Sequence, residues 1–371
     1  MNDLIPPLVS DGQILAEVND SLGLITLNRP QALNALSLGM VRDMTRLLKH
    51  WADCPAIQAV AVMGAGREGK APAFCAGGDI RFFHQAAHAG DAALEDFFTE
   101  EYRLNHLIHR YAKPYIALMD GIVMGGGMGI SQGARLRVLS EHSKLAMPET
   151  GIGLFPDVGG GHFLAQCPGH VGEWLALTGQ AIAAGDAIEW GLGDVFVRAE
   201  HWQGLVDELR HGSQPSAEHV VATVMERVDL APTSDPKAAA ERIDRHFGLP
   251  TVADILASLA ACDEAWAQQT HDALLKRSPT MLAVTLELVR RGRRLSLADD
   301  LRLERDLVHH SFHLRGAARS ETVEGIRALA VDKDHQPRWN PARVADIDAA
   351  EVAAFFTSPW APAQHPLRDL E

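Results

Sequence analysis

The chain has 371 residues, of which 47% are apolar and 22% charged, a composition of globular proteins rather than of disordered or fibrous ones. Its net charge of −14 argues against a nucleic-acid partner, whose binding surface is basic, and against long-range steering of an anionic ligand. The four cysteines are scattered and form no C-x-x-C pair, so we interpret them as reduced thiols rather than as a disulfide scaffold.

The first 200 residues alternate between strand and helix patterns. Two short β-type runs, 14–19 and 24–28, flank a polar turn and predict a hairpin. Ser37 can cap a helix whose apolar residues recur every three to four positions as far as Trp51. This alternation predicts an α/β architecture with parallel strands. Further apolar runs suited to buried strands lie at 57–63, 115–119, 136–140 and 194–197.

The pattern changes near residue 200. Residues 211–216 have the composition of a linker, and helical periodicity dominates beyond them. We therefore expect two regions, an α/β core over 1–205 and a mainly helical region over 206–371. The helical patterns cover about 217–230, 237–247, 251–276, 280–293, 296–314 and 349–356.

The N-terminal segment carries neither a basic leader with an apolar stretch nor an Arg-rich amphipathic presequence. No window of about 18 uncharged apolar residues exists, so we expect no membrane span. These observations favour a cytoplasmic protein, although a mature organellar protein without its presequence would look the same.

One glycine motif is misleading. Gly64–Gly69 matches G-x-G-x-x-G directly after a strand pattern, which by itself suggests a dinucleotide site. No amphipathic helix follows it, and no strand ending in an acid lies about 20 residues further on. We therefore expect a plain loop.

Two other glycine turns are more informative. Phe74–Ile80 contains a Gly-Gly turn with Asp79 in the first turn of a helix, where the helix dipole favours an acid. Gly121–Gly129 is a second glycine-rich turn between a strand and a helix. Glycines let a ligand approach the backbone, and two such turns can each direct one N–H at a single carbonyl oxygen. Together they indicate a backbone oxyanion hole.

Two acids lie in an otherwise apolar, Gly- and Pro-rich segment. Glu149 and Asp157 each follow a proline, which makes the local backbone extended and stiff. Burial and a second nearby carboxylate both raise a carboxyl pKa, so such a pair can transfer protons near neutral pH. Asp157 has a purely structural alternative, because it can cap a helix over residues 159–166.

Two polar clusters have simpler explanations. Arg290–Arg294 is a basic group that fits a solvated helix end better than a phosphate site. His309, His310 and His313 invite a metal assignment, but the sequence places no acid or cysteine beside them to complete a ligand set. We therefore expect no metal.

Three segments, 73–80, 124–129 and 147–161, resemble motifs of the crotonase (enoyl-CoA hydratase/isomerase) superfamily, and specifically those of its 3-hydroxyisobutyryl-CoA hydrolase branch. The resemblance covers nearly the whole chain, since further matching segments lie at 28–36, 100–105, 278–280, 324–328 and 331–339. It implies a core of repeated ββα turns wound into a right-handed spiral, followed by a helical C-terminal region. It also implies an acyl-CoA substrate, no separate cofactor, and a homo-oligomer such as a trimer or hexamer.

The resemblance also assigns roles to individual residues. It implies that Gly78 and Gly126 donate the oxyanion hydrogen bonds and that Glu149 and Asp157 are catalytic. Glu101 matches a position that lines the acyl pocket. The implied substrate contacts are Asn34, Ala35 and Leu36 near the adenine end, and Ala76, Asp79, Glu101, Gly126, Glu149 and Asp157 elsewhere.

One departure from the hydratase pattern bears on the reaction. Hydratases of the family carry a second catalytic Glu three residues past the central oxyanion glycine, where this chain has Gly129. Asp157 occupies a position that is usually Gly in hydratases. We therefore expect hydrolysis of a short 3-hydroxyacyl-CoA. The substrate that we expect most is 3-hydroxyisobutyryl-CoA, an intermediate of valine degradation. The alternatives are an enoyl-CoA hydratase or isomerase, and a non-catalytic acyl-CoA-binding protein.

Overall fold

The computed structural model describes residues 4–232 and 236–371. These residues form two compact units. Among the described residues, one unit comprises 4–78, 103–145 and 182–232 and holds the main β-sheet, so we call it the sheet unit. The other comprises 79–102, 146–181 and 236–371, and we call it the helical unit. Each unit is therefore assembled from three separated stretches of sequence.

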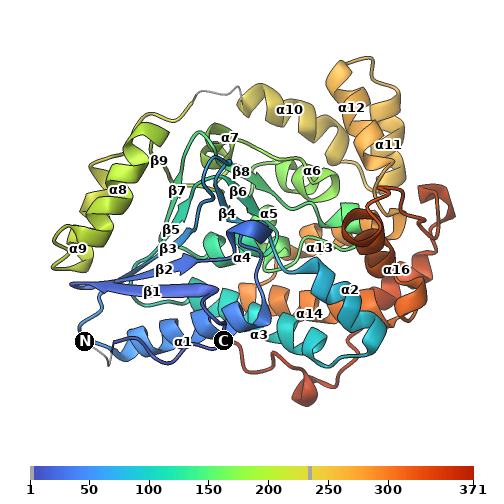
Figure 1. Ribbon diagram of the computed structural model, residues 1–371. Helices are drawn as coiled ribbons and strands as arrows, with labels where there is room; N and C mark the ends of the chain where they lie inside the picture. The colour runs from blue at the N-terminus through green and yellow to red at the C-terminus, as the bar shows by residue number, and fades with distance from the viewer. Residues whose placement is uncertain (1–3, 233–235) are drawn as a thin grey trace. The chain divides into compact units, whose positions relative to one another are not determined.

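A six-stranded sheet organises the sheet unit, with the strand order β1-β2-β3-β5-β7-β9 (Figure 1). The predicted hairpin is confirmed: β1 and β2 are antiparallel, with Ile14 opposite Leu27. Every later neighbour in this sheet pairs in parallel, as the strand–helix alternation predicted. The strands are β1 (Ile14–Asn19), β2 (Leu22–Leu27), β3 (Ala59–Gly64), β5 (Tyr115–Met119), β7 (Leu136–Leu139) and β9 (Val195–Phe196).

Three short strands form a second sheet in the order β4-β6-β8. They are β4 (Ala73–Cys75), β6 (Ile122–Met124) and β8 (Lys144–Ala146). Each follows a strand of the main sheet along the chain, so the pairs β3–β4, β5–β6 and β7–β8 repeat one motif. The first two pairs lead into helices α2 (Ile80–Ala89) and α4 (Gly126–Gln132). This repeated ββα order is the predicted spiral core. The loop between β3 and β4 contains the G-x-G-x-x-G motif and no helix.

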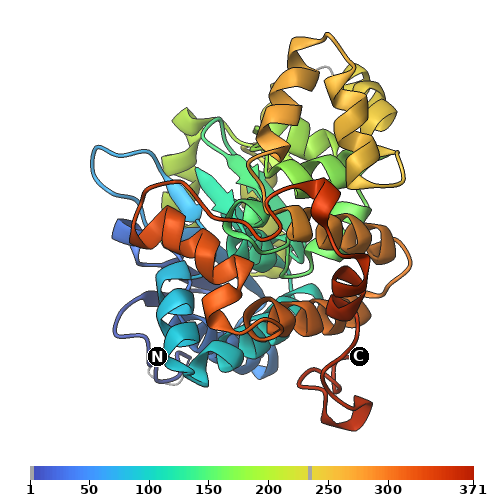
Figure 2. The same cartoon turned by 90° about the vertical axis from the view of Figure 1, so that its right-hand side faces the viewer.

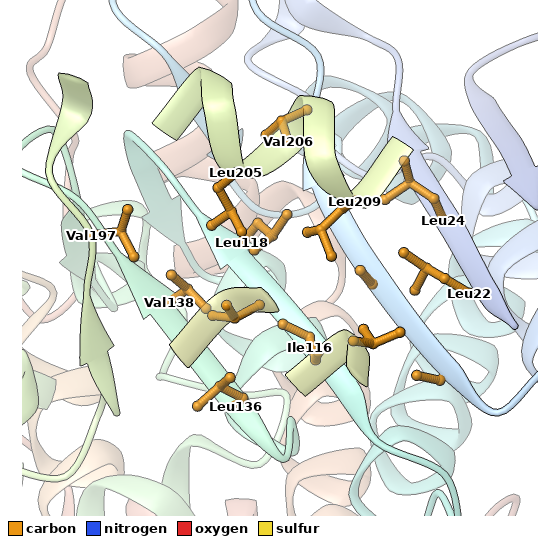
Figure 3. Close-up of a cluster of buried hydrophobic side chains, with 14 residues drawn as sticks. Leu22, Leu24, Ile116, Leu118, Leu136, Val138, Val197, Leu205, Val206 and Leu209 are labelled. Atoms are coloured by element: carbon orange, nitrogen blue, oxygen red, sulfur yellow. The ribbon is translucent and has the colours of Figure 1, made fainter. Parts of the chain in front are cut away.

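Helices α8 (Ala199–His211) and α9 (Ala217–Met225) cover one face of the main sheet. Figure 3 shows Leu205, Val206 and Leu209 of α8 directed at Leu118 and Val138 of the strands. The predicted boundary after residue 205 thus falls inside α8, and this helix belongs to the sheet unit because its apolar side is buried on the strands.

Helix α1 (Leu38–Asp53) begins where the sequence predicted. The Ser37 hydroxyl accepts a hydrogen bond from the N–H of Met40 and caps the helix. The apolar side chains predicted to face the core are buried, including that of Trp51. Trp51 packs against Gly23 of β2, where a methyl group would come within 2.7 Å of the indole. The sheet unit also contains η1 (Pro30–Ala32) and α7 (Ala184–Glu189).

The helical unit contains α2, the first part of α3 (Ala93–His109), and most of the remaining helices (Figure 2). Helix α13 packs against both α5 and α6. The single helix expected over 251–276 is two helices, because the Gln268 side chain donates to the carbonyls of Leu259 and Cys262 and ends the first one. None of the helices in the described ranges is long and apolar enough to cross a membrane.

The other elements of the helical unit are η2 (Glu149–Ile152), α5 (Gly160–Ala165), α6 (Val171–Thr178), α10 (Pro236–Phe247), α11 (Val252–Ala260), α12 (Ala265–Leu274), α13 (Pro279–Gly292), α14 (Leu297–His313), η3 (Ala317–Arg319), α15 (Glu321–Ile326), η4 (Arg327–Val331), η5 (Val344–Asp346), α16 (Ala349–Phe355) and η6 (Pro362–Gln364).

The turn between β5 and β6 depends on a glycine. Gly121 has φ +85°, and a methyl group there would lie 2.0 Å from the carbonyl oxygen of Pro72. We predict that Gly121→Ala lowers the free energy of unfolding by at least about 2 kcal/mol, because it adds backbone strain to a backbone clash. Gly204→Ala in α8 is the matched control, since nothing lies within 4 Å of that position. The control should be neutral or stabilising by up to about 1 kcal/mol. Urea denaturation of both variants tests this, and equal stabilities would contradict it.

Candidate active site

Three acids predicted to act on the substrate lie in the helical unit. Glu149 is the first residue of η2, immediately after Pro148, and Asp157 lies in the loop before α5. Glu101 lies on α3. All three are buried, with exposed fractions of 7% for Glu149, 5% for Asp157 and 2% for Glu101. Charged side chains are rarely buried without a partner, so this grouping is typical of a functional site.

Tyr102 fixes the orientation of Asp157. Its hydroxyl donates a hydrogen bond to Oδ2 of Asp157 at a distance of 2.8 Å. The structural alternative for Asp157 is wrong, because the N-cap of α5 is Gly159 and the first N–H groups of that helix donate to other acids, Glu304 and Asp300. Asp157 contributes to the turn only through its carbonyl, which accepts from Gly160 N–H at 2.8 Å. Its carboxylate is therefore directed to Tyr102 rather than to the helix.

The burial of these acids shifts their protonation equilibria. Burial, together with the negative charge of Asp157, raises the pKa of Glu149 well above its ordinary value. Burial and the charges of Asp157 and Glu149 do the same to the pKa of Glu101. Burial raises the pKa of Asp157 to about 6, and the Tyr102 hydrogen bond limits this increase. The three carboxyls cannot all ionise easily, so the cluster can hold or release a proton near neutral pH.

Two further acids support this loop and were not predicted. Glu304 on α14 accepts hydrogen bonds from the N–H groups of Gly159 at 2.7 Å and Gly161 at 3.0 Å. Asp300, one turn earlier, accepts from the N–H of His162 at 2.8 Å. Burial raises the pKa of both carboxyls, that of Asp300 to about 7. The only sequence signal was their spacing of four residues, which is equally typical of an exposed helix face.

The backbone that carries Glu149 is held from several sides. The Thr150 hydroxyl donates to the carbonyl of Leu177 at 3.0 Å, and the Thr150 carbonyl accepts from Ser278 N–H at 3.3 Å. Gly153 has φ +67°, and a methyl group there would lie 2.2 Å from the carbonyl oxygen of Glu321. Glu149 is therefore presented by a rigid, closely packed turn.

The two predicted oxyanion turns lie side by side in the sheet unit. Gly77 has φ +107°, and a methyl group there would lie 3.6 Å from the backbone nitrogen of Gly126. The carbonyl of Gly77 accepts from Leu36 N–H at 2.8 Å, and Leu36 and Gly78 form a parallel bridge. Gly126 is the first residue of α4, so its N–H has no partner within the helix. The turn that holds Gly77 and Gly78 thus lies beside the first residue of α4, and the oxyanion role of Gly78 and Gly126 stays a prediction.

The residues expected near the adenine end also lie in the sheet unit. Asn34 is buried, and its side chain donates to the carbonyls of Ala65 and Ala73 at 3.1 and 2.8 Å. The Ala35 carbonyl accepts from the Arg29 guanidinium at 2.8 Å. Ala76 N–H donates to the Leu33 carbonyl. The Asn34 side chain therefore fixes these loops. Asp79, in the helical unit, is the N-cap of α2 rather than a residue of its first turn.

One set of side chains among the described residues has the composition of a metal site. Glu95 of α3 lies beside His309 and His313 of α14. The structure thus supplies the carboxylate that the sequence did not place next to these histidines.

Known proteins similar to this chain are enzymes that act on coenzyme A thioesters. The enoyl-CoA hydratase/isomerase family model matches residues 22–356. The chain is 40% identical to the mitochondrial 3-hydroxyisobutyryl-CoA hydrolase of Xenopus tropicalis over 94% of this chain and 90% of that protein. It is 39% identical to the mitochondrial 3-hydroxyisobutyryl-CoA hydrolase of Rattus norvegicus (93% and 89% covered). It is 35% identical to a probable 3-hydroxyisobutyryl-CoA hydrolase of Arabidopsis thaliana (94% and 92% covered).

Two solved structures resemble the fold closely. A carnitinyl-CoA dehydratase from Mycobacterium thermoresistibile has a TM-score of 0.87 and 38% identity, covering 97% of this chain and 99% of that one. An enoyl-CoA hydratase from Rhodobacter sphaeroides has a TM-score of 0.83 and 37% identity, covering 94% and 98%. The chain therefore belongs to the enoyl-CoA hydratase/isomerase (crotonase) superfamily, in the branch of the 3-hydroxyisobutyryl-CoA hydrolases.

Proposed function

We propose that this protein hydrolyses 3-hydroxyisobutyryl-CoA to 3-hydroxyisobutyrate and coenzyme A, a step of valine breakdown. The observation that carries the proposal is the buried pair Glu149 and Asp157, together with a glycine at position 129. The hydrolases named above, which align over more than nine-tenths of the chain, support the same reaction.

In the proposed mechanism, the N–H groups of Gly78 and Gly126 bind the thioester oxygen. Water, or the Glu149 carboxylate itself, attacks the carbonyl carbon to give a tetrahedral oxyanion that these donors stabilise. Collapse breaks the carbon–sulfur bond, and the sulfur of coenzyme A leaves with a proton. If Glu149 attacks first, water then opens the resulting anhydride. Either route needs Glu149 ionised and no separate cofactor.

The remaining predicted residues bind the substrate in this proposal. Asp157 binds the 3-hydroxyl group or assists proton transfer, and Glu101 lines the acyl pocket. Ala76 and Asp79 lie along the thioester, and Asn34, Ala35 and Leu36 near the adenine. The Asn34 side chain is engaged by two carbonyls, so we assign its contribution to the backbone of this loop.

The second candidate function is hydration of an enoyl-CoA, which is favoured by the names of the two similar solved structures, a hydratase and a dehydratase. Hydration in this family uses a second Glu at the position of Gly129. Gly129 is buried within α4 and offers no side chain. We therefore place hydration second.

The cellular location and the oligomeric state stay predictions. The vertebrate relatives are named as mitochondrial proteins. For this chain we propose the cytoplasm, or an organelle after removal of a presequence. We also propose a homo-oligomer, a trimer or hexamer, whose size light scattering can measure.

Removal of either acid tests the proposal directly. We predict that Glu149→Gln lowers thiol release from 3-hydroxyisobutyryl-CoA by about 10²–10⁴-fold, because it removes the base or nucleophile. Asp157→Asn should also lower it. Glu189→Gln, which alters an exposed acid in α7, is the control and should keep wild-type activity. Release of free thiol is followed with a thiol reagent, and full activity in Glu149→Gln would rule out the mechanism.

The raised pKa values predict a specific pH dependence. The value of kcat/KM should fall as the pH drops and Glu149 is protonated, at a pH above that expected of an ordinary glutamate. The charge of Asp157 contributes to the raised pKa of Glu149, so Asp157→Asn should move this acidic limb to lower pH. Asp207→Asn on the exposed side of α8 should leave the limb in place. A limb that stays fixed, or moves upward, in Asp157→Asn would contradict this assignment.

The role of position 129 is tested by adding the missing acid. We predict that the wild type adds water to crotonyl-CoA poorly and that Gly129→Glu raises this rate. The change in absorbance of the enoyl thioester measures hydration. Efficient hydration by the wild type would show that the absence of a Glu at position 129 does not decide the reaction.

A further inference from the structure

Helices α3 and α14 bring three side chains together outside the predicted site. His309 and His313 lie one turn apart on α14, and Glu95 lies in the first turn of α3. His309 Nδ1 is 3.2 Å from Oε1 of Glu95, and His313 Nε2 is 2.8 Å from the same oxygen. One donor atom from each residue lies within 4.8 Å of the others, and this is the only such group of three found among the described residues. We call it the Glu95–His309–His313 cluster.

His309 Nδ1 lies near both oxygens of Glu95, at 3.2 Å from Oε1 and 3.3 Å from Oε2, whereas the other partners of the two oxygens differ. Oε2 forms a close ion pair with the guanidinium of Arg305, which also donates to the Thr99 hydroxyl at 3.0 Å. The ring of Trp360 packs against this guanidinium, with its centroid 4.8 Å from Cζ, and against the His309 ring at 4.8 Å. Arg305 is itself buried. Arg305 thus holds the Glu95 carboxylate through Oε2, while Oε1 contacts both imidazoles.

This spacing suits a metal ion. In a tetrahedral zinc site with ligand bonds of 2.0–2.2 Å, donor atoms lie about 3.3 Å apart. Both contacts to Oε1 are already near this value, and the two imidazole nitrogens, at most 4.8 Å apart, need only side-chain rotation to approach each other. The three side chains are 26–47% exposed, so an ion and completing water molecules can reach them. Arg305 then acts as an outer partner that orients the ligating carboxylate.

We propose that Glu95, His309 and His313 bind one divalent transition-metal ion, with Zn²⁺ the best match. Two imidazole nitrogens and one carboxylate oxygen are ligands of intermediate hardness, which suit Zn²⁺, Ni²⁺ and Co²⁺. Mg²⁺ and Ca²⁺ prefer oxygen ligands alone. Binding replaces the hydrogen bonds between the imidazoles and Oε1 by metal–ligand bonds. The neighbouring Arg305 charge opposes a second cation, so we expect a reversible site rather than a permanent structural one.

The site joins the two helices whose side chains support Asp157 and the glycine turn that follows it. Tyr102 lies on α3 and Glu304 on α14. An ion that binds the folded cluster but not the unfolded chain stabilises the protein in proportion to its concentration. Metal binding at this cluster therefore acts on the stability of the helical unit, and it does not depend on the proposed hydrolase reaction.

The experiment is a Zn²⁺ titration of the full-length protein after treatment with a chelator. Isothermal titration calorimetry should give one Zn²⁺ per chain, and excess Zn²⁺ should raise the thermal midpoint by a few degrees. His309→Gln and His313→Gln should each weaken binding at least tenfold and abolish the thermal shift. Two such variants are used, with circular dichroism to confirm folding, so that misfolding of one does not decide the result.

Two matched controls make the assignment specific. His310→Gln alters the intervening histidine of α14, whose Nε2 contacts the Thr357 carbonyl instead, and should bind Zn²⁺ like the wild type. His84→Gln alters another close histidine pair, His84 and His88 of α2, which forms no three-ligand group within the described ranges. Loss of binding in His84→Gln with retention in His313→Gln would overturn the proposal. The proposal would also be overturned if the wild type showed no saturable Zn²⁺ binding, or if Mg²⁺ raised the thermal midpoint as much as Zn²⁺ does.

Discussion

The burial of several carboxyl groups in one region of the helical unit is the constraint on which the rest of this structure depends. Glu101, Glu149 and Asp157 are each less than 10% exposed, and no cation pairs with them in the described contacts. Such burial opposes ionisation and costs folding free energy at neutral pH. Part of this cost is offset locally, because the Tyr102 hydroxyl donates to the Asp157 carboxylate.

The support extends to a second layer of acids. Glu304 and Asp300 accept N–H groups from the glycine-rich turn after Asp157, so α14 fixes the loop that carries the proposed catalytic acid. The same helix carries His309 and His313 two turns further on. One helix therefore links the support of the carboxylate cluster to the proposed metal site, and Arg305 lies between the two.

In the sheet unit, two glycine turns allow two segments of backbone to approach each other closely. An oxyanion hole made of backbone needs two chain segments to approach more closely than side chains allow. The positive φ at Gly77 and the short distance from it to the nitrogen of Gly126 show that approach. Strands β4 and β6, which pair in parallel, bring the two turns to the same edge of the small sheet.

The sequence by itself determined much of the local structure and the family. Periodicity predicted the hairpin, the buried strands and the capped helix α1, because side-chain alternation and capping are local properties. The motifs around Gly78, Gly126, Glu149 and Asp157 predicted the family, since they are contiguous. The break between α11 and α12 was missed because it depends on the Gln268 side chain reaching back to two carbonyls.

Only the tertiary structure decided which distant residues meet. Tyr102 contacts Asp157 across 55 positions, Glu304 contacts Gly159 across 145, and His313 contacts Glu95 across 218. No local periodicity encodes such contacts, because they arise when helices from separated stretches pack together. For the same reason the expected division at residue 205 and the expected absence of an acid beside the histidines could not be judged from sequence. Both depend on how the chain returns to each unit.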